Sequence, residues 1–303
     1  MAADAKNAPV PGKPVPLAPG LRRILAPNPS PMTYTGTNTY LLGTRDIAVI
    51  DPGPPDDAHL QAILDALEAH QRISHIVVTH SHIDHSPLAM VLAQITDAPV
   101  HGFGGSSAGR APVMDGFRNM GGGEGVDETF MPDRSLADGG QLRGTDWTLE
   151  ALHTPGHMGN HLCLHWAEGR ALFSGDLVMG WATSMVSPPD GHLTDFMASL
   201  HRLAAREGDA VYYPGHGAPI DEPAARVQEL LAHRQMREAQ ILDALAGGAL
   251  TPEGLTRKIY IDVDPALLPA AERNVVAHLI DLSLRKRVRP VGKLSLVASF
   301  ELV

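Results

Sequence analysis

Histidine and aspartate side chains that can bind a metal gather in one short stretch, residues 79–85, which reads T-H-S-H-I-D-H. Imidazole nitrogen and carboxylate oxygen are ligands of borderline-soft dications such as Zn²⁺. The apolar run at residues 76–78 predicts a strand that ends just before the stretch. Side chains alternate in an extended segment, so His80 and His82 would share one face. Asp84 and His85 can point to a second position, which favours two adjacent metal sites over a histidine-rich surface loop.

Three histidine and aspartate residues later in the chain each follow a short apolar run and stand beside a glycine. His157 stands in T-P-G-H, Asp176 in F-S-G-D and His216 in Y-P-G-H-G. Glycine permits the tight turns that such loops need. Each motif therefore predicts a tight turn after a short strand.

Together these motifs resemble the metallo-β-lactamase superfamily, whose hallmark is T-H-x-H-x-D-H, over roughly residues 21–235. The resemblance implies two divalent metal ions, with Zn²⁺ the expected ion, and Asp84 as a catalytic residue. It assigns the first metal to His80, His82 and His157. It assigns the second metal to Asp84, His85 and His216, with Asp176 bridging the two.

The implied reaction is hydrolysis. Two dications that share a solvent molecule lower its pKa from ~15.7 toward ~7, so that hydroxide forms at neutral pH. That hydroxide attacks an ester, thioester, lactone or similar carbonyl of a small-molecule substrate, and no protein nucleophile is needed. The single cysteine, Cys163, lies in an apolar L-C-L run and is predicted to be a core residue.

Two alternatives remain open. The first is an endoribonuclease or phosphodiesterase acting on single-stranded RNA, which the basic run at residues 285–289, beginning with Arg285 and ending with Arg289, would contact. The second is a mononuclear iron oxygenase on the same fold. Asp176 argues against dedicated β-lactam hydrolysis, because true β-lactamases of the superfamily lack that aspartate. The resemblance is closest to the β-lactamase-like endoribonuclease and glyoxalase II-like branch, which ends in a winged-helix-like module.

The resemblance also implies the architecture, an α/β fold built as a four-layer αβ/βα sandwich. We expect a proline-rich arm at residues 1–20, a catalytic domain at 21–246 and a winged-helix-like module at 249–303. Apolar periodicity predicts the helices and strands. Strands are expected at residues 21–25, 37–42, 47–51, 99–102, 147–152, 161–166, 170–173, 210–213 and, as a pair, 291–303. Helices are expected at residues 56–70, 87–95, 193–206, 223–245, 251–259 and 266–284.

Two loops are of interest. Residues 36–38 are expected near the metals. The glycine-rich residues 102–125 could form a mobile lid, but a loose insertion is preferred because glycine gives freedom without chemistry.

Bulk composition narrows the setting. The net charge of −10 over 303 residues argues against a general polyanion binder, though not against a local basic patch. One cysteine excludes an intrachain disulfide and fits a reducing compartment. The sequence shows no run of 18 apolar residues and no secretory start, so we expect a cytoplasmic protein without a membrane span.

Overall fold

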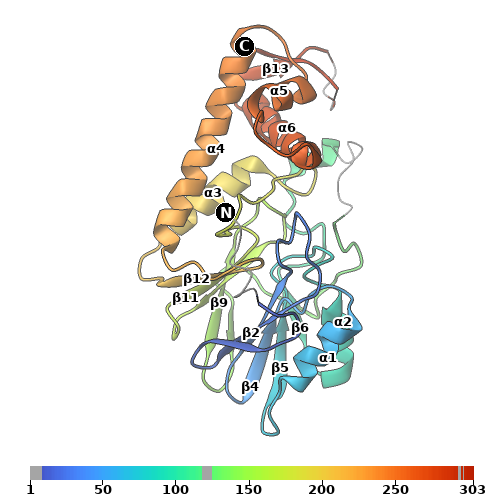
Figure 1. The fold of residues 1–303 in the computed structure, drawn as a ribbon, viewed down its shortest axis with the longest axis vertical. Helices are drawn as coiled ribbons and strands as arrows, with labels where there is room; N and C mark the ends of the chain where they lie inside the picture. The colour runs from blue at the N-terminus through green and yellow to red at the C-terminus, as the bar shows by residue number, and fades with distance from the viewer. Residues whose placement is uncertain (1–8, 118–124, 293–294, 296) are drawn as a thin grey trace.

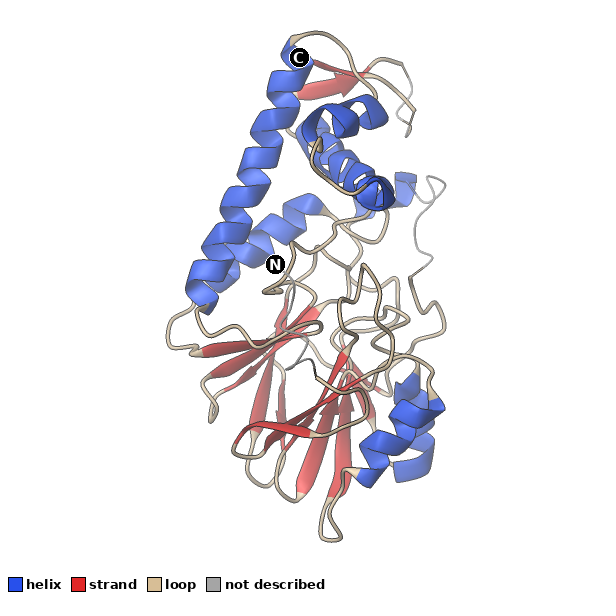
Figure 2. Cartoon of the chain, in the orientation of Figure 1, coloured by secondary structure: helices blue, strands red, loops and turns tan. Residues whose placement is uncertain are grey.

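Two β-sheets face each other and carry helices on their outer sides (Figure 1). The structure, a computed structural model, describes residues 9–117, 125–292, 295 and 297–303. Figure 2 shows most strands gathered in the sandwich, a separate strand pair near the C-terminus, and the helices around and beyond the sandwich. Within the described residues, no helix is long and apolar enough to cross a membrane.

The first sheet has seven strands in chain order. Its first four strands are antiparallel to one another, and the last three add in parallel. The parallel strands send their carboxyl ends to the same edge. The strands are β1 (Val15–Ala18), β2 (Leu21–Leu25), β3 (Asn38–Leu42), β4 (Asp46–Ile50), β5 (Arg72–Val77), β6 (Val100–Gly102) and β7 (Arg134–Ser135).

The second sheet has the order β12-β11-β10-β9-β8. Only β11 and β12 run parallel, so both end at the edge where the loops after β5 lie. The strands are β8 (Gln141–Arg143), β9 (Thr148–His153), β10 (Leu162–Trp166), β11 (Ala171–Gly175) and β12 (Val211–Pro214).

Three apolar layers hold the sandwich together. Tyr40, Trp147 and Phe173 pack between the sheets. Helices α1 (Asp57–Asp65) and α2 (Leu88–Thr96) pack on the outer face of the first sheet. Helices α3 (Leu193–Ala204) and α4 (Pro223–Ala246) pack on the outer face of the second. The predicted four-layer αβ/βα architecture is confirmed.

The C-terminal module follows α4 and lies at the far end of that helix from the second sheet (Figure 1). Its apolar cluster includes Leu255, Leu279 and Phe300 and is completed by Ile241 and Leu245 at the end of α4. Helix α6 also packs on the catalytic domain, since Val276 and Ile280 bury Met114 and Phe117. The elements are α5 (Pro252–Ile259), the 3₁₀ helix η2 (Pro265–Leu267), α6 (Leu268–Leu284), β13 (Val288–Pro290) and β14 (Phe300–Leu302).

Several expected boundaries were wrong. Part of the expected arm, β1, is an edge strand of the first sheet. Helix α1 ends at Asp65 because its last turn tightens and Arg22 donates to the Ala66 carbonyl. The strand pair expected at 291–303 begins earlier, at β13, and the short strands β7 and β8 were not predicted.

The glycine-rich passage at residues 102–125 is packed over much of its described length. It contains the 3₁₀ helix η1 (Pro112–Phe117), whose Met114 and Phe117 are buried against α6. The loose insertion preferred from the sequence was therefore wrong for this part. Residues 118–124 lie outside the described residues, and the alternative of a lid stays untested.

Candidate metal centre

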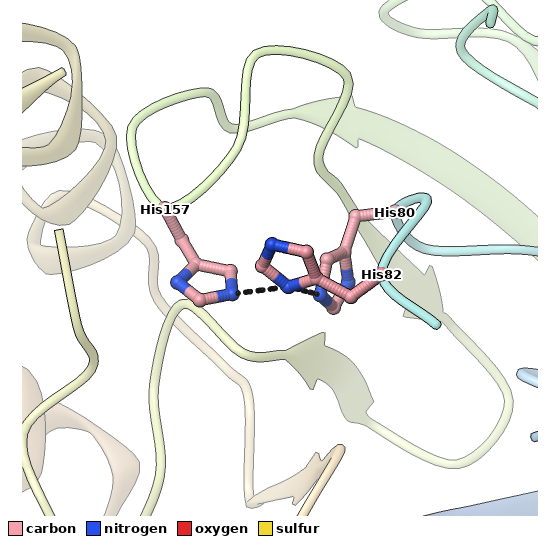
Figure 3. A group of neighbouring side chains, drawn as sticks. All are labelled: His80, His82 and His157. Atoms are coloured by element: carbon pink, nitrogen blue, oxygen red, sulfur yellow. Dashed lines mark hydrogen bonds between the residues drawn. The ribbon is translucent and has the colours of Figure 1, made fainter. Parts of the chain in front are cut away.

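The seven predicted ligands come together at one edge of the sandwich. The loop after β5 supplies His80, His82, Asp84 and His85, and single residues follow β9, β11 and β12. In the first group, His80 Nε2 lies 2.9 Å from His82 Nδ1, and His157 Nε2 lies 3.1 Å from the same atom. Figure 3 shows these three rings pointing toward one another.

The second group lies beside the first. His216 Nε2 is 3.1 Å from Asp84 Oδ2, and His85 Nε2 is 3.4 Å from that oxygen. The two Nε2 atoms of His85 and His216 are 3.3 Å apart. Ligands on a tetrahedral ion with bonds of about 2.0–2.2 Å lie ~3.3–3.6 Å from one another. The second group, at 3.1–3.4 Å, is close to that spacing, and the first, at 2.9 and 3.1 Å, is slightly tighter.

Asp176 reaches both groups. Its Oδ2 lies 3.3 Å from His216 Nε2 and 3.7 Å from His157 Nε2, and its Oδ1 lies 3.6 Å from His85 Nε2. Oδ1 is buried and has no hydrogen-bond partner among the described residues. A buried carboxylate oxygen without a partner is costly unless a cation or a donor satisfies it. The donor set and this oxygen therefore fit a pair of bound cations.

The buried carboxylates of the site are stabilised by nearby positive charge. Burial opposes ionisation of Asp176, yet the charges of His216 and His85 hold its pKa well below the usual range. Burial likewise disfavours a charge on His216, but Asp176 and Asp84 raise the pKa of that ring to about 9. By contrast, burial lowers the pKa of His82 to about 3. Without a metal, protons on His85 and His216 can balance the negative charges of Asp84 and Asp176. With metal cations bound, the cations would balance those charges and the imidazole rings could be neutral.

Asp51 forms hydrogen bonds to Thr79 and to the candidate ligand His85, a role that the sequence did not reveal. Its carboxylate is buried and accepts from the Thr79 backbone N–H at 2.7 Å and from the Thr79 hydroxyl at 2.8 Å. Its Oδ2 also lies 2.9 Å from His85 Nδ1. With Nδ1–H donating to Asp51, the Nε2 of His85 is left free to bind a metal. The D-P-G motif after β4 can be recognised in the sequence, but it does not predict the contact between Asp51 and His85.

The other rings are oriented in the same way. His157 Nδ1 donates to the Met185 carbonyl at 2.7 Å, and His216 Nδ1 donates to the Gly36 carbonyl at 3.1 Å. The Thr37 hydroxyl donates to Asp84 Oδ2 at 3.2 Å. The prediction that residues 36–38 lie near the site is confirmed.

A buried chain of polar groups holds Asp176. The Asp176 backbone N–H donates to His161 Nε2 at 3.1 Å, so His161 Nδ1 carries the proton and donates to the Thr154 hydroxyl at 3.0 Å. Cys163 lies beside Thr154, fully buried, and burial raises the pKa of its thiol to about 12. The prediction that Cys163 is a core residue is confirmed.

A cavity of about 790 Å³ opens onto the cluster. Its floor includes His82, Asp84, His157, Asp176 and His216. Its walls are largely apolar, with a few polar groups that could orient a ligand. The wall residues include Met32, Ile83, Val126, Met179 and Met185, with Ser187 and Asp190 among the polar ones.

Comparison with known proteins agrees with this geometry. Residues 32–216 match the metallo-beta-lactamase superfamily, and residues 251–294 match the beta-lactamase associated winged helix domain. The chain therefore belongs to the metallo-beta-lactamase superfamily, and its C-terminal module is a winged-helix domain. Both predictions made from the sequence are confirmed.

Individual relatives cover most of the chain. A beta-lactamase-like protein 2 homolog of Caenorhabditis elegans is 33% identical over 266 residues, 86% of this chain and 82% of that protein. An atrochrysone carboxyl ACP thioesterase of Aspergillus fumigatus is 30% identical over 296 residues, 91% of this chain and 84% of that protein.

Solved structures share the fold over nearly the whole chain. A beta-lactamase domain protein from Burkholderia ambifaria has a TM-score of 0.81 at 23% identity, covering 99% of this chain and 96% of that one. A metallo-beta-lactamase family protein from Thermus thermophilus has a TM-score of 0.75 at 26% identity, covering 95% of this chain and 100% of that one. The similarity in fold thus extends over both domains of this chain.

Proposed function

We propose that the protein is a dinuclear metal-dependent hydrolase that acts on an ester, thioester, lactone or similar carbonyl. The observation that carries the proposal is the placement of Asp176 between two groups of donors, with one buried oxygen that has no hydrogen-bond partner among the described residues. Zn²⁺ is the expected ion, since imidazole and carboxylate, the donors of this cluster, suit it.

Six side chains would hold the two ions in two groups of three, and Asp176 lies between the groups. His80, His82 and His157 would hold one ion, and Asp84, His85 and His216 the other. Bound there, two divalent ions would act as Lewis acids and lower the pKa of a coordinated water from ~15.7 toward ~7. The chain itself orients the ring nitrogens through Asp51, Met185 and Gly36 and holds Asp84 in place through the Thr37 hydroxyl.

The cavity supports a small substrate with an apolar part. Methionine side chains, including Met179 and Met185, are flexible and adapt to irregular apolar groups. The Aspergillus fumigatus relative, named a thioesterase, supports a thioester among the carbonyl substrates.

RNA cleavage has less support in the structure. Arg285 pairs with Glu238 and Asp281, each at 2.6 Å, and Arg289 pairs with Glu301 at 2.7 Å. These carboxylates neutralise two positive charges of the basic run at residues 285–289, the candidate RNA contact. The attraction of that run for phosphate is therefore reduced.

The test is a screen of the zinc-loaded protein against acyl thioesters, esters, lactones, nitrocefin and single-stranded RNA. We expect turnover of a carbonyl substrate, lost in Asp176→Asn. The matched control is Asp209→Asn, which breaks an ion pair with Arg206 at the other end of β12 and should leave turnover in place. Cleavage of RNA alone, weakened by salt and by Arg285→Ala, would refute the proposal, as would equal turnover in Asp176→Asn and the parent chain.

A further inference from the structure

One irregular segment lies between the candidate bridging residue and α3, and we call residues 177–190 the wall segment. It contains no helix or strand. Met179, Met185, Ser187 and Asp190 of this segment line the cavity. The Met185 carbonyl also accepts the Nδ1–H of His157 at 2.7 Å. A segment without regular backbone hydrogen bonds needs other contacts to hold it in place.

Those contacts come from α4 and from α6 of the winged-helix domain. The Asn274 Oδ1 accepts the Val186 backbone N–H at 3.1 Å and the Arg234 Nη1–H at 2.9 Å. Arg234 also donates to the Ser184 carbonyl. The Asn274 amide nitrogen donates to the Ala270 carbonyl at 3.1 Å, which fixes which way the amide faces.

Arg273 adds a second anchor on the same side. Its Nε donates to the Ser187 hydroxyl at 3.0 Å, and its guanidinium also donates to the Pro188 carbonyl. Arg273 and Asn274 are neighbours on α6, so a single helix turn holds residues 186–188 of the wall segment. Figure 1 shows α4 running from the sandwich to the domain that contains α6.

The decisive feature is that one peptide group makes both contacts. The Met185 carbonyl and the Val186 N–H belong to the same planar unit and, in a trans peptide, point in opposite directions. His157 donates to one end of this unit, and Asn274 accepts from the other. Asn274 therefore fixes the plane of the group that orients His157, and its contact also makes the Met185 carbonyl a stronger acceptor.

We propose that Asn274, held by Arg234, is a positioning residue for His157, so that the winged-helix domain completes the three-histidine metal site. This inference rests on the metal centre of the proposed function. Arg234 is 4% exposed and Asn274 reaches it from another domain, so the arrangement is built into the interior of the molecule. The domain is thus part of the catalytic architecture. Deleting residues 249–303 would therefore weaken metal binding at the three-histidine site.

The experiment measures metal affinity and needs no substrate. In a His216→Ala chain, which weakens the second group, Zn²⁺ binding by chelator competition reports on the three-histidine site. Asn274→Leu keeps the volume but removes the acceptor, and we expect a ~10-fold loss of affinity, the usual effect of removing a group that orients a ligand. Asn274→Asp keeps an oxygen facing Val186 and Arg234 and should restore most of the affinity.

The matched control is Thr194→Val. The Thr194 hydroxyl donates to Asp281 Oδ1 at 2.6 Å, so this variant also breaks a contact between the catalytic domain and α6. It does not touch the wall segment and should lower stability without changing Zn²⁺ affinity. Should Asn274→Leu not fold, Asn274→Ala is measured in the same way.

Parent affinity in Asn274→Leu would overturn the inference, and so would equal losses in Asn274→Leu and Thr194→Val, which would show general destabilisation. If neither the unmodified protein nor the His216→Ala variant bound Zn²⁺, the result would instead contradict the proposed function. The two failures are therefore distinguishable.

Discussion

Replacing Asp51 by Asn should weaken the second group of candidate ligands without touching any of them. The Asp51 carboxylate is 2% exposed and accepts two hydrogen bonds from Thr79 and one from His85. Asparagine has a single acceptor oxygen, and its NH₂ would face donors. The Nδ1–H of His85 then loses its anionic acceptor, and the ring loses the contact that directs Nε2 toward Asp84 and His216.

The size of the effect follows from these contacts. Losing the partner of a metal-binding imidazole lowers metal affinity ~10–100-fold, which is about 1.4–2.7 kcal/mol. A hydrogen bond to a charged group contributes about 1.5–3 kcal/mol to stability, so the free energy of unfolding should fall by a similar amount. Asp209→Asn, which also removes a buried charge but lies far from the site, should share the stability loss only.

The assay is Zn²⁺ competition in a His82→Ala chain, which weakens the three-histidine site and leaves Asp84, His85 and His216. We expect Asp51→Asn to bind at least ~10-fold more weakly than this parent, and Asp209→Asn to bind as the parent does. Equal affinity in Asp51→Asn and the parent would refute the role assigned to Asp51.

Three further outcomes are expected. Asp84→Ala should lower kcat/KM by more than ~100-fold while circular dichroism stays native, since it removes a ligand rather than a ligand's partner; retained turnover would contradict the assignment. Burial lowers the pKa of His59 to about 4, so the unfolded chain binds a proton below pH 6.5 that the folded chain does not, and stability should fall by about 2 kcal/mol between pH 7 and pH 5. The free energy of unfolding of His59→Gln, measured with urea, should change less between pH 7 and pH 5 than that of the parent chain. The same pH dependence in both proteins would contradict this prediction. Iodoacetamide should modify Cys163 only after denaturation, because burial raises the pKa of its thiol to about 12; rapid labelling of the native protein would argue against this.

The sequence predicted the cluster at residues 80–85 from its residue types and spacing, and the resemblance to the metallo-β-lactamase superfamily then identified His157, Asp176 and His216. Long elements were also predictable. Helix α4, for example, begins at a proline and ends at a glycine pair. Its apolar positions recur at helical spacing, which is enough to identify a helix of this length.

What the sequence could not show depends on contacts between distant backbone groups. Met185 orients His157 through its carbonyl, which every residue type has, so its identity gave no signal. Asn274 lies in a different domain from the peptide group that it holds. Strand β1 contains Pro16, which indicated an extended arm rather than an edge strand, although proline is tolerated at such edges.

The central claim is that one site holds two metal ions with Asp176 between them. Plasma mass spectrometry of the protein, purified after growth with zinc and dialysed against metal-free buffer, tests it directly. We expect two equivalents of zinc per chain, fewer in Asp176→Ala, and two in Asp209→Asn. One iron per chain, or two zinc ions that remain in Asp176→Ala with unchanged affinity, would contradict it.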